Sequence, residues 1–281
     1  SATFGLNQAI HGVVKAGTHV IATAADHNAT LRPLHYLKKK GCIHLTVVSC
    51  DGRGWVDPDD IVRAWRPNTS LVTLSHSSNV TGVTQEVESI IKVAQEREAL
   101  SLLDASQSLG HVTFSQYESM ADIVVSPGHK WLMGMHGIAV LYAREGIHFD
   151  PLIQGGTGSM SESLEMPVEM QDQVEVGTSD FPAAAALLAG CKWLKEERME
   201  SVTAACKGCA QACYDELCDI QGVRVITPDP ASDVLGPPII SMVCDGYSPF
   251  EVAALFEQIA GVQVRSGYHC AARIHEFLGT T

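Results

Sequence analysis

The chain has 281 residues, of which 46% are hydrophobic and 18% are charged. This composition excludes collagen-like, disordered and small disulfide-rich proteins. The formal net charge of −13 argues against a nucleic-acid partner, because coating phosphates needs clustered basic residues. No apolar run reaches the length of a membrane helix, so we expect no membrane partner. Nine cysteines, an odd number spread along the chain, fit a reducing, cytoplasmic compartment better than a disulfide framework.

The first half of the chain alternates short apolar runs with helical patterns. The apolar runs predict strands at 19–23, 44–48, 71–75, 100–103, 122–125 and 138–142. The patterns between them predict helices at 5–15, 28–40, 60–65 and 87–98. Strands that alternate with helices indicate βαβ units and a largely parallel sheet covered on both faces.

The pattern changes after residue 145. Residues 155–176 are irregular and predict a long ordered loop, a kind of segment that is often functional. The remaining patterns predict helices at 182–200, 203–220 and 250–259 and strands at 223–226, 239–243 and 262–265. We therefore expect a large α/β domain over residues 1–190 and a smaller α+β domain over residues 191–281.

Two polar residues come at the ends of predicted strands. Lys130 closes the run Ser-Pro-Gly-His-Lys at 126–130, directly after an apolar strand. Burial lowers the pKa of a lysine and prepares it as a Schiff-base nucleophile, although a solvated loop lysine is an equally open interpretation. Asp104 follows the strand at 100–103, where a carboxylate suits a ligand crevice and could hold a protonated pyridine nitrogen. It could equally be a turn or cap residue.

Together, and in order along nearly the whole chain, these segments resemble the pyridoxal-phosphate enzymes of fold type I. More narrowly they resemble the class V aminotransferase-like cysteine desulfurases with a short catalytic-cysteine loop, the group II type to which selenocysteine lyase is related. The resemblance implies pyridoxal 5'-phosphate as cofactor. It also implies a mostly parallel α/β sheet of the seven-stranded type with helices on both faces, plus a smaller α+β domain.

The resemblance assigns the residues around the cofactor ring. Lys130 resembles the lysine that bonds to the cofactor and later moves the Cα proton of the substrate. Asp104 resembles the partner of the pyridine nitrogen. Gln107 and Asn79, the latter in His-Ser-Ser-Asn-Val-Thr-Gly, resemble donors to the phenolic oxygen of the ring. His27 resembles the catalytic-site histidine that stacks on the ring; without the resemblance it would be a cap or surface residue.

Phosphate binding is implied at several positions. Thr3 comes just before the first predicted helix, whose N-terminus would receive the anion together with His129. Pro127 stands where the family carries a Ser or Thr ligand, so Ser126 would have to replace that contact. Thr178, in Glu-Val-Gly-Thr, resembles the threonine that reaches the cofactor phosphate of the neighbouring subunit, which implies a homodimer.

The run Arg-Ser-Gly-Tyr-His-Cys-Ala at 265–271 is similar to the group II signature. A cysteine on a Gly-containing loop, next to His and near Arg, lies where its thiolate is stabilised. By resemblance, Cys270 takes the sulfur of L-cysteine or the selenium of selenocysteine and becomes a persulfide, while alanine leaves. Arg265 would bind substrate. The sulfur would then pass to an acceptor protein, typically for iron–sulfur cluster supply.

The chain also departs from the family pattern. Asp26 replaces the usual Glu, Ser1 replaces a Gly, and residues 179–181 differ from Pro-Asn-Thr. The arginine that clamps the substrate carboxylate, and the residues that precede the phosphate loop, are absent. We therefore expect a fragment lacking both ends, one that binds cofactor weakly.

Four cysteines at 206, 209, 213 and 218 have a spacing that superficially suits a metal. They fall in an unbroken helical pattern, and a straight helix cannot gather four thiolates around one ion. We therefore expect no metal and cysteines buried on one helix face. Two rival functions stay open: a selenocysteine lyase or other class V aminotransferase, and a cofactor-less cysteine-rich binding protein.

Overall fold

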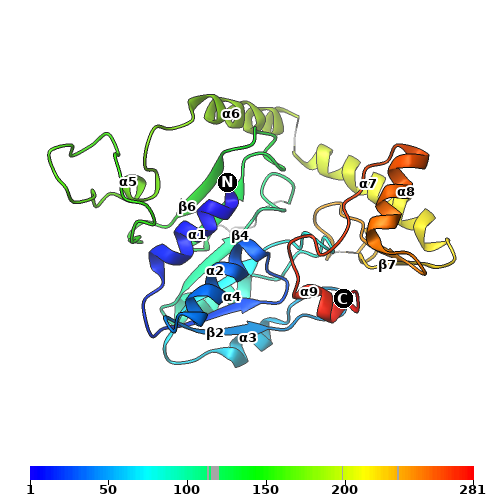
Figure 1. The fold of residues 1–281 in the computed structure, drawn as a ribbon, viewed down its shortest axis with the longest axis horizontal. Helices are drawn as coiled ribbons and strands as arrows, with labels where there is room; N and C mark the ends of the chain where they lie inside the picture. The colour runs from blue at the N-terminus through cyan, green and yellow to red at the C-terminus, as the bar shows by residue number, and fades with distance from the viewer. Residues whose placement is uncertain (113, 115–119, 198, 233) are drawn as a thin grey trace.

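The central sheet has six strands among the residues that the computed structural model describes, namely 1–112, 114, 120–197, 199–232 and 234–281. The strands are β1 (His19–Thr23), β2 (His44–Val48), β3 (Thr69–Ser75), β4 (Leu100–Asp104), β5 (Ile123–Pro127) and β6 (Ala139–Ala143). Their order is β2-β1-β3-β4-β5-β6 (Figure 1). β1 to β5 pair in parallel and β6 runs antiparallel to β5. The mostly parallel sheet is confirmed, with six strands in the described residues where the seven-stranded type was expected.

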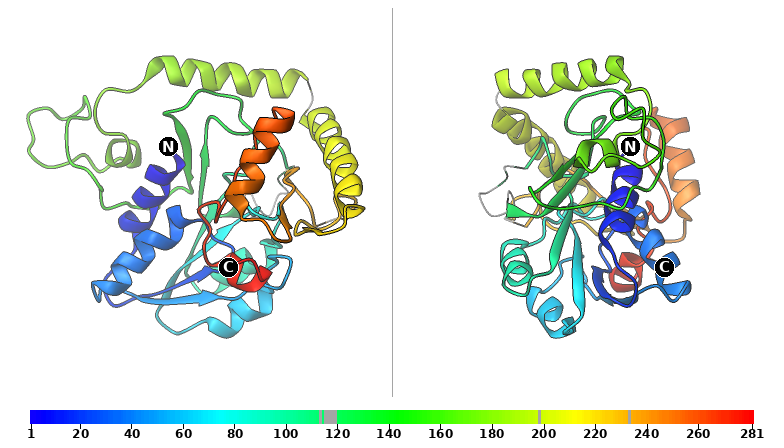
Figure 2. Two further views of the ribbon diagram at one scale, coloured as in Figure 1. Left: turned by 45° about the vertical axis from the view of Figure 1, so that its right-hand side comes forward. Right: turned by 90° about the vertical axis from the view of Figure 1, so that its left-hand side faces the viewer.

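Helices cover both faces of this sheet (Figure 2). They are α1 (Ala2–Val13) and α2 (Asn28–Lys39) on one face and α3 (Pro58–Ala64) and α4 (Glu88–Glu96) on the other. Alternate strand residues point to opposite faces, so Val20 joins the core beneath α1 and α2 while Ile21 joins the core beneath α3 and α4. Both side chains are fully buried. This two-sided burial explains why the strands are continuous apolar runs in the sequence.

The first helix begins earlier than the sequence predicted. Its N-cap is Ser1, whose hydroxyl accepts a hydrogen bond from the Phe4 N–H, so α1 starts at Ala2 and not at residue 5. Thr3 therefore lies inside the first turn of the helix and not before it. A similar cap begins α3, where Asp57 accepts from the Asp59 N–H and Pro58 takes the first helical position.

The remainder of the chain forms helices and a small sheet beside the main one (Figure 1). The elements are α5 (Met170–Val174), α6 (Phe181–Glu196), α7 (Met199–Cys218), β7 (Val223–Val225), β8 (Met242–Cys244), α8 (Pro249–Ala260) and α9 (Ile274–Leu278). β7 and β8 pair antiparallel. The expected domain boundary at residue 190 falls inside α6. The division of the chain into two domains stays a prediction. Ser248 and Glu251 form a capping box that fixes the start of α8.

One predicted strand is wrong. Residues 262–265 contain two valines in alternation, yet Val262 and Val264 are 45% and 43% exposed and pair with no strand of the described chain. The segment is instead extended chain that leads from α8 to the Cys270 loop. In the described residues, no helix combines the length and apolar character that crossing a membrane requires.

Candidate functional site

The carboxyl ends of three neighbouring strands form the floor of the site. Asp104 is the last residue of β4 and pairs in register with Ser75 of β3 and Val125 of β5. Its carboxylate is 6% exposed, and its Oδ1 accepts a hydrogen bond from the Ser106 N–H. Lys130 follows the end of β5 by three residues. Crevices at the carboxyl ends of parallel strands are where open α/β sheets bind ligands.

A tight turn holds Lys130 over this floor. The Gly134 N–H donates to the Gly128 carbonyl at 2.7 Å, and the Met133 N–H donates to the Lys130 carbonyl at 3.1 Å. A Cβ at position 134 would lie 2.8 Å from the Gly128 oxygen, so only glycine fits there. Two backbone hydrogen bonds therefore close the turn and fix the backbone at Lys130.

The surroundings of Lys130 lower the pKa of its amine. Burial lowers the pKa of its amine, and the positive charge of Arg265 lowers it further. The carboxylate of Asp104 and the sulfur of Cys270 act in the opposite direction and raise that pKa. The balance is a lowered pKa, which makes the neutral, nucleophilic amine more accessible near neutral pH.

Lys130 and Asp104 line one cavity of about 230 Å³, which we call the strand-end cavity. Other residues expected from the sequence line the same cavity: Thr3, His27, Asn79, Gln107, His129 and Arg265. They come from α1, the start of α2, the loops after β3, β4 and β5, and the segment before Cys270. The fold thus gathers residues that are scattered along more than 260 positions of sequence.

One wall of the strand-end cavity suits an anion. Ala2 and Thr3 line it from the first turn of α1, where backbone N–H groups have no partner within the helix. His129 lies beside them, stacked on His136 with ring centroids 4.6 Å apart. The Nδ1 atom of His129 is buried without a hydrogen-bond partner in the structure. A phosphate bound here would satisfy these donors.

Two amide side chains of the cavity are already engaged. The Asn79 Nδ2 donates to the His269 carbonyl at 2.6 Å and ties the loop after β3 to the Cys270 loop. The Gln107 Oε1 accepts from the Trp131 indole N–H at 3.4 Å. The resemblance had implied that both amides reach a cofactor oxygen, and their places in the cavity wall are compatible with that.

His27 has both roles that the sequence left open. Its Nδ1 accepts a hydrogen bond from the Ala29 N–H at 2.9 Å, so it caps α2. The same ring lines the strand-end cavity. Burial lowers the pKa of His27, and the charges of Lys130, Arg265 and Arg32 lower it further, against the opposing effect of Asp104. The ring is therefore neutral at neutral pH, with the proton on Nε2.

Cys270 lies on a strained loop at the edge of the site. Both His269 and Cys270 have positive φ, 49° and 60°, which non-glycine residues rarely adopt. The Cys270 carbonyl accepts from the Asn28 N–H at 2.7 Å, which fixes the loop to the start of α2. The Arg265 Nη2 lies 3.2 Å from the Cys270 sulfur. The sulfur is therefore held between the start of α2 and the Arg265 side chain.

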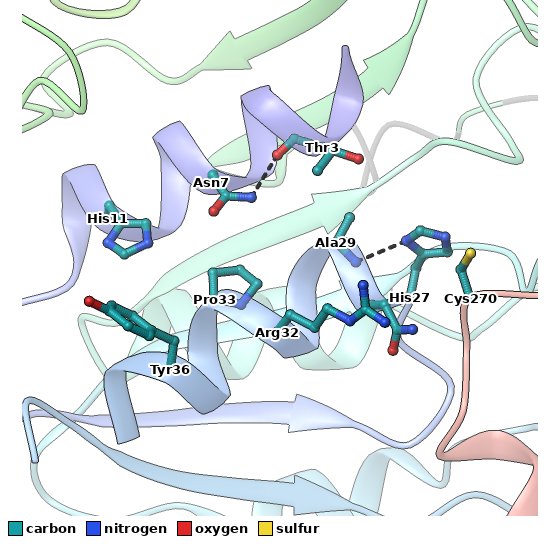
Figure 3. Close-up of a pocket in the computed structure, with 10 residues that line it drawn as sticks. Thr3, Asn7, His11, His27, Ala29, Arg32, Pro33, Tyr36 and Cys270 are labelled. Atoms are coloured by element: carbon teal, nitrogen blue, oxygen red, sulfur yellow. Dashed lines mark hydrogen bonds between the residues drawn. The ribbon is translucent and has the colours of Figure 1, made fainter. Parts of the chain in front are cut away.

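Cys270 lines a different cavity from Lys130. This second cavity of about 510 Å³ runs between α1 and α2, and we call it the α1–α2 groove. Figure 3 shows Cys270 at one end of the groove beside His27, with Tyr36 and His11 at the other end. Thr3 and His27 line both cavities and form part of the wall between them.

Two expected phosphate ligands do not line the strand-end cavity. Ser126 is 2% exposed, and its hydroxyl donates to the Ala105 carbonyl at 3.3 Å, so it does not replace the contact that Pro127 lacks. Thr178 is exposed on the segment between α5 and α6. It does not reach the cavity of its own chain; the expectation concerned a neighbouring subunit, and it stays a proposal.

The cysteines of α7 are not buried, contrary to expectation. Cys209, Cys213 and Cys218 are exposed and Cys206 is half-buried, because α7 buries only Ala210. Among the described residues, no group of three or more His, Cys, Asp or Glu side chains is arranged to hold a metal ion.

Asp26, which the sequence showed only as a replacement for the usual Glu, connects the ends of two strands. Its carboxylate is fully buried and accepts hydrogen bonds from the Thr23 N–H, the Ser75 N–H and the Thr73 hydroxyl. Burial raises the pKa of Asp26 to about 6. The usable signal was its position three residues after the end of the buried strand β1.

Comparison with known proteins agrees with this geometry. The chain is 29% identical to probable cysteine desulfurases from Methanothermobacter thermautotrophicus and from Pyrococcus abyssi, covering 95% and 92% of its own length but 68% and 64% of theirs. The chain thus spans about two thirds of these curated relatives. An apo cysteine desulfurase from Thermococcus onnurineus superposes with a TM-score of 0.86 at 28% identity, covering 99% of this chain and 70% of the other.

A more distant structure supports the fold alone. The cysteine desulfurase from Escherichia coli superposes with a TM-score of 0.86 at 20% identity, over the whole chain and 70% of the other.

The family model for aminotransferase class-V matches residues 1–281, the full length of the sequence. The chain therefore belongs to the aminotransferase class-V family.

Proposed function

We propose that the chain carries out pyridoxal-phosphate-dependent cysteine desulfuration, in which L-cysteine becomes L-alanine and its sulfur is left as a persulfide on Cys270. One observation carries the proposal. An amine and a carboxylate, Lys130 and Asp104, share a cavity at the strand ends, and Arg265, which lines the same cavity, contacts the Cys270 sulfur. The names of the similar proteins point to the same reaction.

The residues of the strand-end cavity fit the cofactor. The unpartnered Nδ1 of His129 and the first turn of α1, with Thr3, would hold its phosphate. Asp104 would hold the ring nitrogen, Asn79 and Gln107 would face the ring oxygen, and His27 would lie against the ring. When bound, this cofactor stores the electron pair released at the substrate Cα.

The chain supplies the proton and sulfur chemistry. Lys130, with its lowered pKa, would bond to the cofactor and would later take the Cα proton of the substrate. Arg265 lines the strand-end cavity and contacts the Cys270 sulfur, so it can orient both the substrate and the attacking sulfur. The Cys270 thiolate would then attack the substrate sulfur. A sulfur–sulfur bond to Cys270 would form, the bond from that sulfur to the substrate Cβ would break with its electron pair left on carbon, and a proton added there would give alanine.

The experiment combines a covalent label with product analysis. The chain is mixed with pyridoxal 5'-phosphate and reduced with borohydride, and the modified peptide is located by mass. We expect the adduct on Lys130. In Cys270→Ala the adduct should persist while alanine formation from L-cysteine stops; the matched control Cys191→Ala should retain both. An adduct at another lysine, or alanine formed at the normal rate by Cys270→Ala, would refute the proposal.

The same experiment separates the rival functions. Pyruvate in place of alanine would indicate transamination by another class V aminotransferase, and cleavage confined to selenocysteine would indicate a lyase for that substrate. A preparation that takes up no cofactor but carries stoichiometric metal would indicate a cysteine-rich binding protein. The sulfur acceptor, a role in iron–sulfur cluster assembly, a homodimer and a cytoplasmic location are further parts of the proposal. The nine free cysteines support a reducing compartment.

A further inference from the structure

The α1–α2 groove is a second route to Cys270. Of these two cavities, Lys130 lines the strand-end cavity and Cys270 lines the groove, so sulfur received from one side can be given away on the other. Cys270 is exposed, and Figure 3 shows its sulfur at the end of the groove next to His27. A thiol that takes sulfur from Cys270 can therefore approach along the groove without entering the strand-end cavity.

The dimensions of the groove suit a short stretch of polypeptide. Its volume is about 510 Å³. Along α2 it extends from His27 to Tyr36, roughly 13 Å at 1.5 Å of helix rise per residue. An extended segment of about four residues spans that length. The side chain of Tyr36 is 54% exposed and offers a broad amphipathic surface at the far end.

The charge of the groove selects an anionic occupant. Arg32 lines it from α2 and forms no ion pair or hydrogen bond with any other part of the described chain. Among the residues that the structure describes, no Asp or Glu lines the groove. α2 contains no acidic residue and ends in Lys38 and Lys39, with Lys40 directly after it. In a chain of net charge −13, this helix is a local exception and attracts an acidic surface.

We propose that the α1–α2 groove docks an acidic segment of the sulfur-accepting protein and brings its acceptor thiol to Cys270. This inference rests on the proposed function for the sulfur that is transferred. The acceptor thiolate attacks the outer sulfur of the Cys270 persulfide. The bond from that sulfur to the Cys270 Sγ breaks, a sulfur–sulfur bond to the acceptor forms, and Cys270 leaves as a thiolate without an external oxidant or reductant.

The first test measures docking without any reaction. A labelled short peptide with glutamates around one serine is titrated with the full chain and followed by fluorescence anisotropy; a matched peptide carries glutamines instead. We expect the glutamate peptide to bind about tenfold more tightly at low salt, and the difference to shrink as salt screens the charges. Equal binding of the two peptides at low salt would overturn the proposal.

Two variants locate the binding. Arg32→Glu should abolish the preference for the glutamate peptide, and Arg32→Gln, which adds no repulsion, should reduce it. Lys207→Glu changes the net charge by the same amount on the exposed surface of α7 and should leave the preference in place. An equal loss in Arg32→Glu and Lys207→Glu would show that net charge alone acts and would overturn the groove as the site.

The second test measures transfer with peptides in which cysteine replaces the serine. The chain is loaded by L-cysteine, and persulfide on each peptide is measured by mass. We expect faster transfer to the glutamate peptide, and a loss of that advantage in Arg32→Glu. If Cys270 forms no persulfide, the proposed function fails while the anisotropy result still decides docking. If the persulfide forms and both peptides accept sulfur equally fast, the docking proposal fails.

Discussion

At the scale of single residues, Asp26 shows how burial and hydrogen bonding compete in one carboxylate. Three donors, from Thr23, Ser75 and Thr73, converge on its oxygens and join the ends of β1 and β3. Desolvation outweighs them and raises the pKa to about 6, from an ordinary value of 3.8. The negative charge of Asp104 adds to this rise.

The raised pKa predicts how stability depends on pH. Since the folded chain holds this proton more tightly than the unfolded chain, the stabilisation from Asp26 is fully present below pH 3.8 and is lost as the pH rises through about 6. Between pH 7 and pH 5, which is about one unit below the folded pKa, the free energy of unfolding should therefore gain about 1.4 kcal/mol from this group, at roughly 1.36 kcal/mol per pKa unit.

Denaturant unfolding of Asp26→Asn checks this prediction. Asparagine does not titrate, so the variant should lose that gain on going from pH 7 to pH 5. The exposed Asp59→Asn is the control and should show the same pH dependence as the natural chain. If the free energy of unfolding depends on pH in the same way in Asp26→Asn and in the natural chain, the raised pKa of Asp26 is wrong.

A second residue-scale prediction concerns the sulfur itself. The Arg265 Nη2 lies 3.2 Å from the Cys270 Sγ, so the sulfur has a cationic neighbour that holds it in place. Arg265→Gln removes the charge but keeps a polar side chain. We expect iodoacetamide to label Cys270 more slowly in this variant, because the sulfur loses that neighbour.

Labelling is measured by mass on the Cys270 peptide. The exposed Cys191, on α6, is an internal control in the same molecule and should react at an unchanged rate. A Cys270 rate that does not change in Arg265→Gln would mean that the guanidinium does not activate the sulfur.

At the scale of elements, α6 supports the turn that carries Lys130. Gly190 lies in the middle of α6, and a Cβ there would collide with the Leu132 carbonyl oxygen and lie 2.9 Å from the Met133 carbonyl carbon. Only glycine allows the helix to approach that closely. The contact connects a helix distant in sequence to the position of the lysine.

Gly190→Ala should therefore push α6 away from the Lys130 turn. We expect a loss of about 1–3 kcal/mol in the free energy of unfolding from overpacking, together with less borohydride-trapped cofactor on Lys130. Gly208→Ala is the matched control in α7, where a Cβ meets nothing within 4 Å. It should stabilise the chain by about 0.5–1 kcal/mol, because alanine is the better helix former. A Gly190→Ala variant as stable as the natural chain would show that α6 does not hold the turn.

The elements differ in how well the sequence predicts them. β1 is buried on both faces, so its apolar run marks a strand without ambiguity, and the expected range matches the observed one. The valines at 262 and 264 are also β-branched residues in an apolar pattern but lie exposed, because no strand of the described chain pairs with them. Local pattern predicts a strand only where the fold supplies a partner, and that information is not local.

The residues of the candidate site also differ in how well the sequence predicts their positions. Asp104 and Lys130 could be placed in one crevice because parallel strands end at the same edge of a sheet. The hydrogen bond from Ser126 to the Ala105 carbonyl depends on how the end of β5 packs beside the segment after β4, so no sequence pattern predicts it. The same holds for Asp26, whose partners lie on two strands, and for Arg32, whose position in the groove follows from how α1 packs against α2.

At the scale of the whole molecule, α6 exposes an apolar face that the described chain leaves uncovered. Phe181 and Leu188, seven residues apart and therefore on one side of the helix, are 73% and 56% exposed, and the helix buries only Ala183, Gly190 and Leu194. The segment before it adds Leu164 and Val168, both strongly exposed. Apolar surface of this kind on one side of a protein is typical of an interface. In the proposed homodimer this face would be covered, and Thr178, just before α6, would lie near the neighbouring subunit.

Leu188→Glu tests that arrangement by placing a charge in the middle of the face. Burying an uncompensated carboxylate costs several kcal/mol, so sedimentation velocity should show the natural chain as a dimer and Leu188→Glu as a monomer at the same concentration. Ile259→Glu is the control, because Ile259 is 80% exposed on α8, far along the chain from α6. Dissociation by Ile259→Glu but not by Leu188→Glu would move the interface to α8, and Thr178 would then have no route to a second cofactor site.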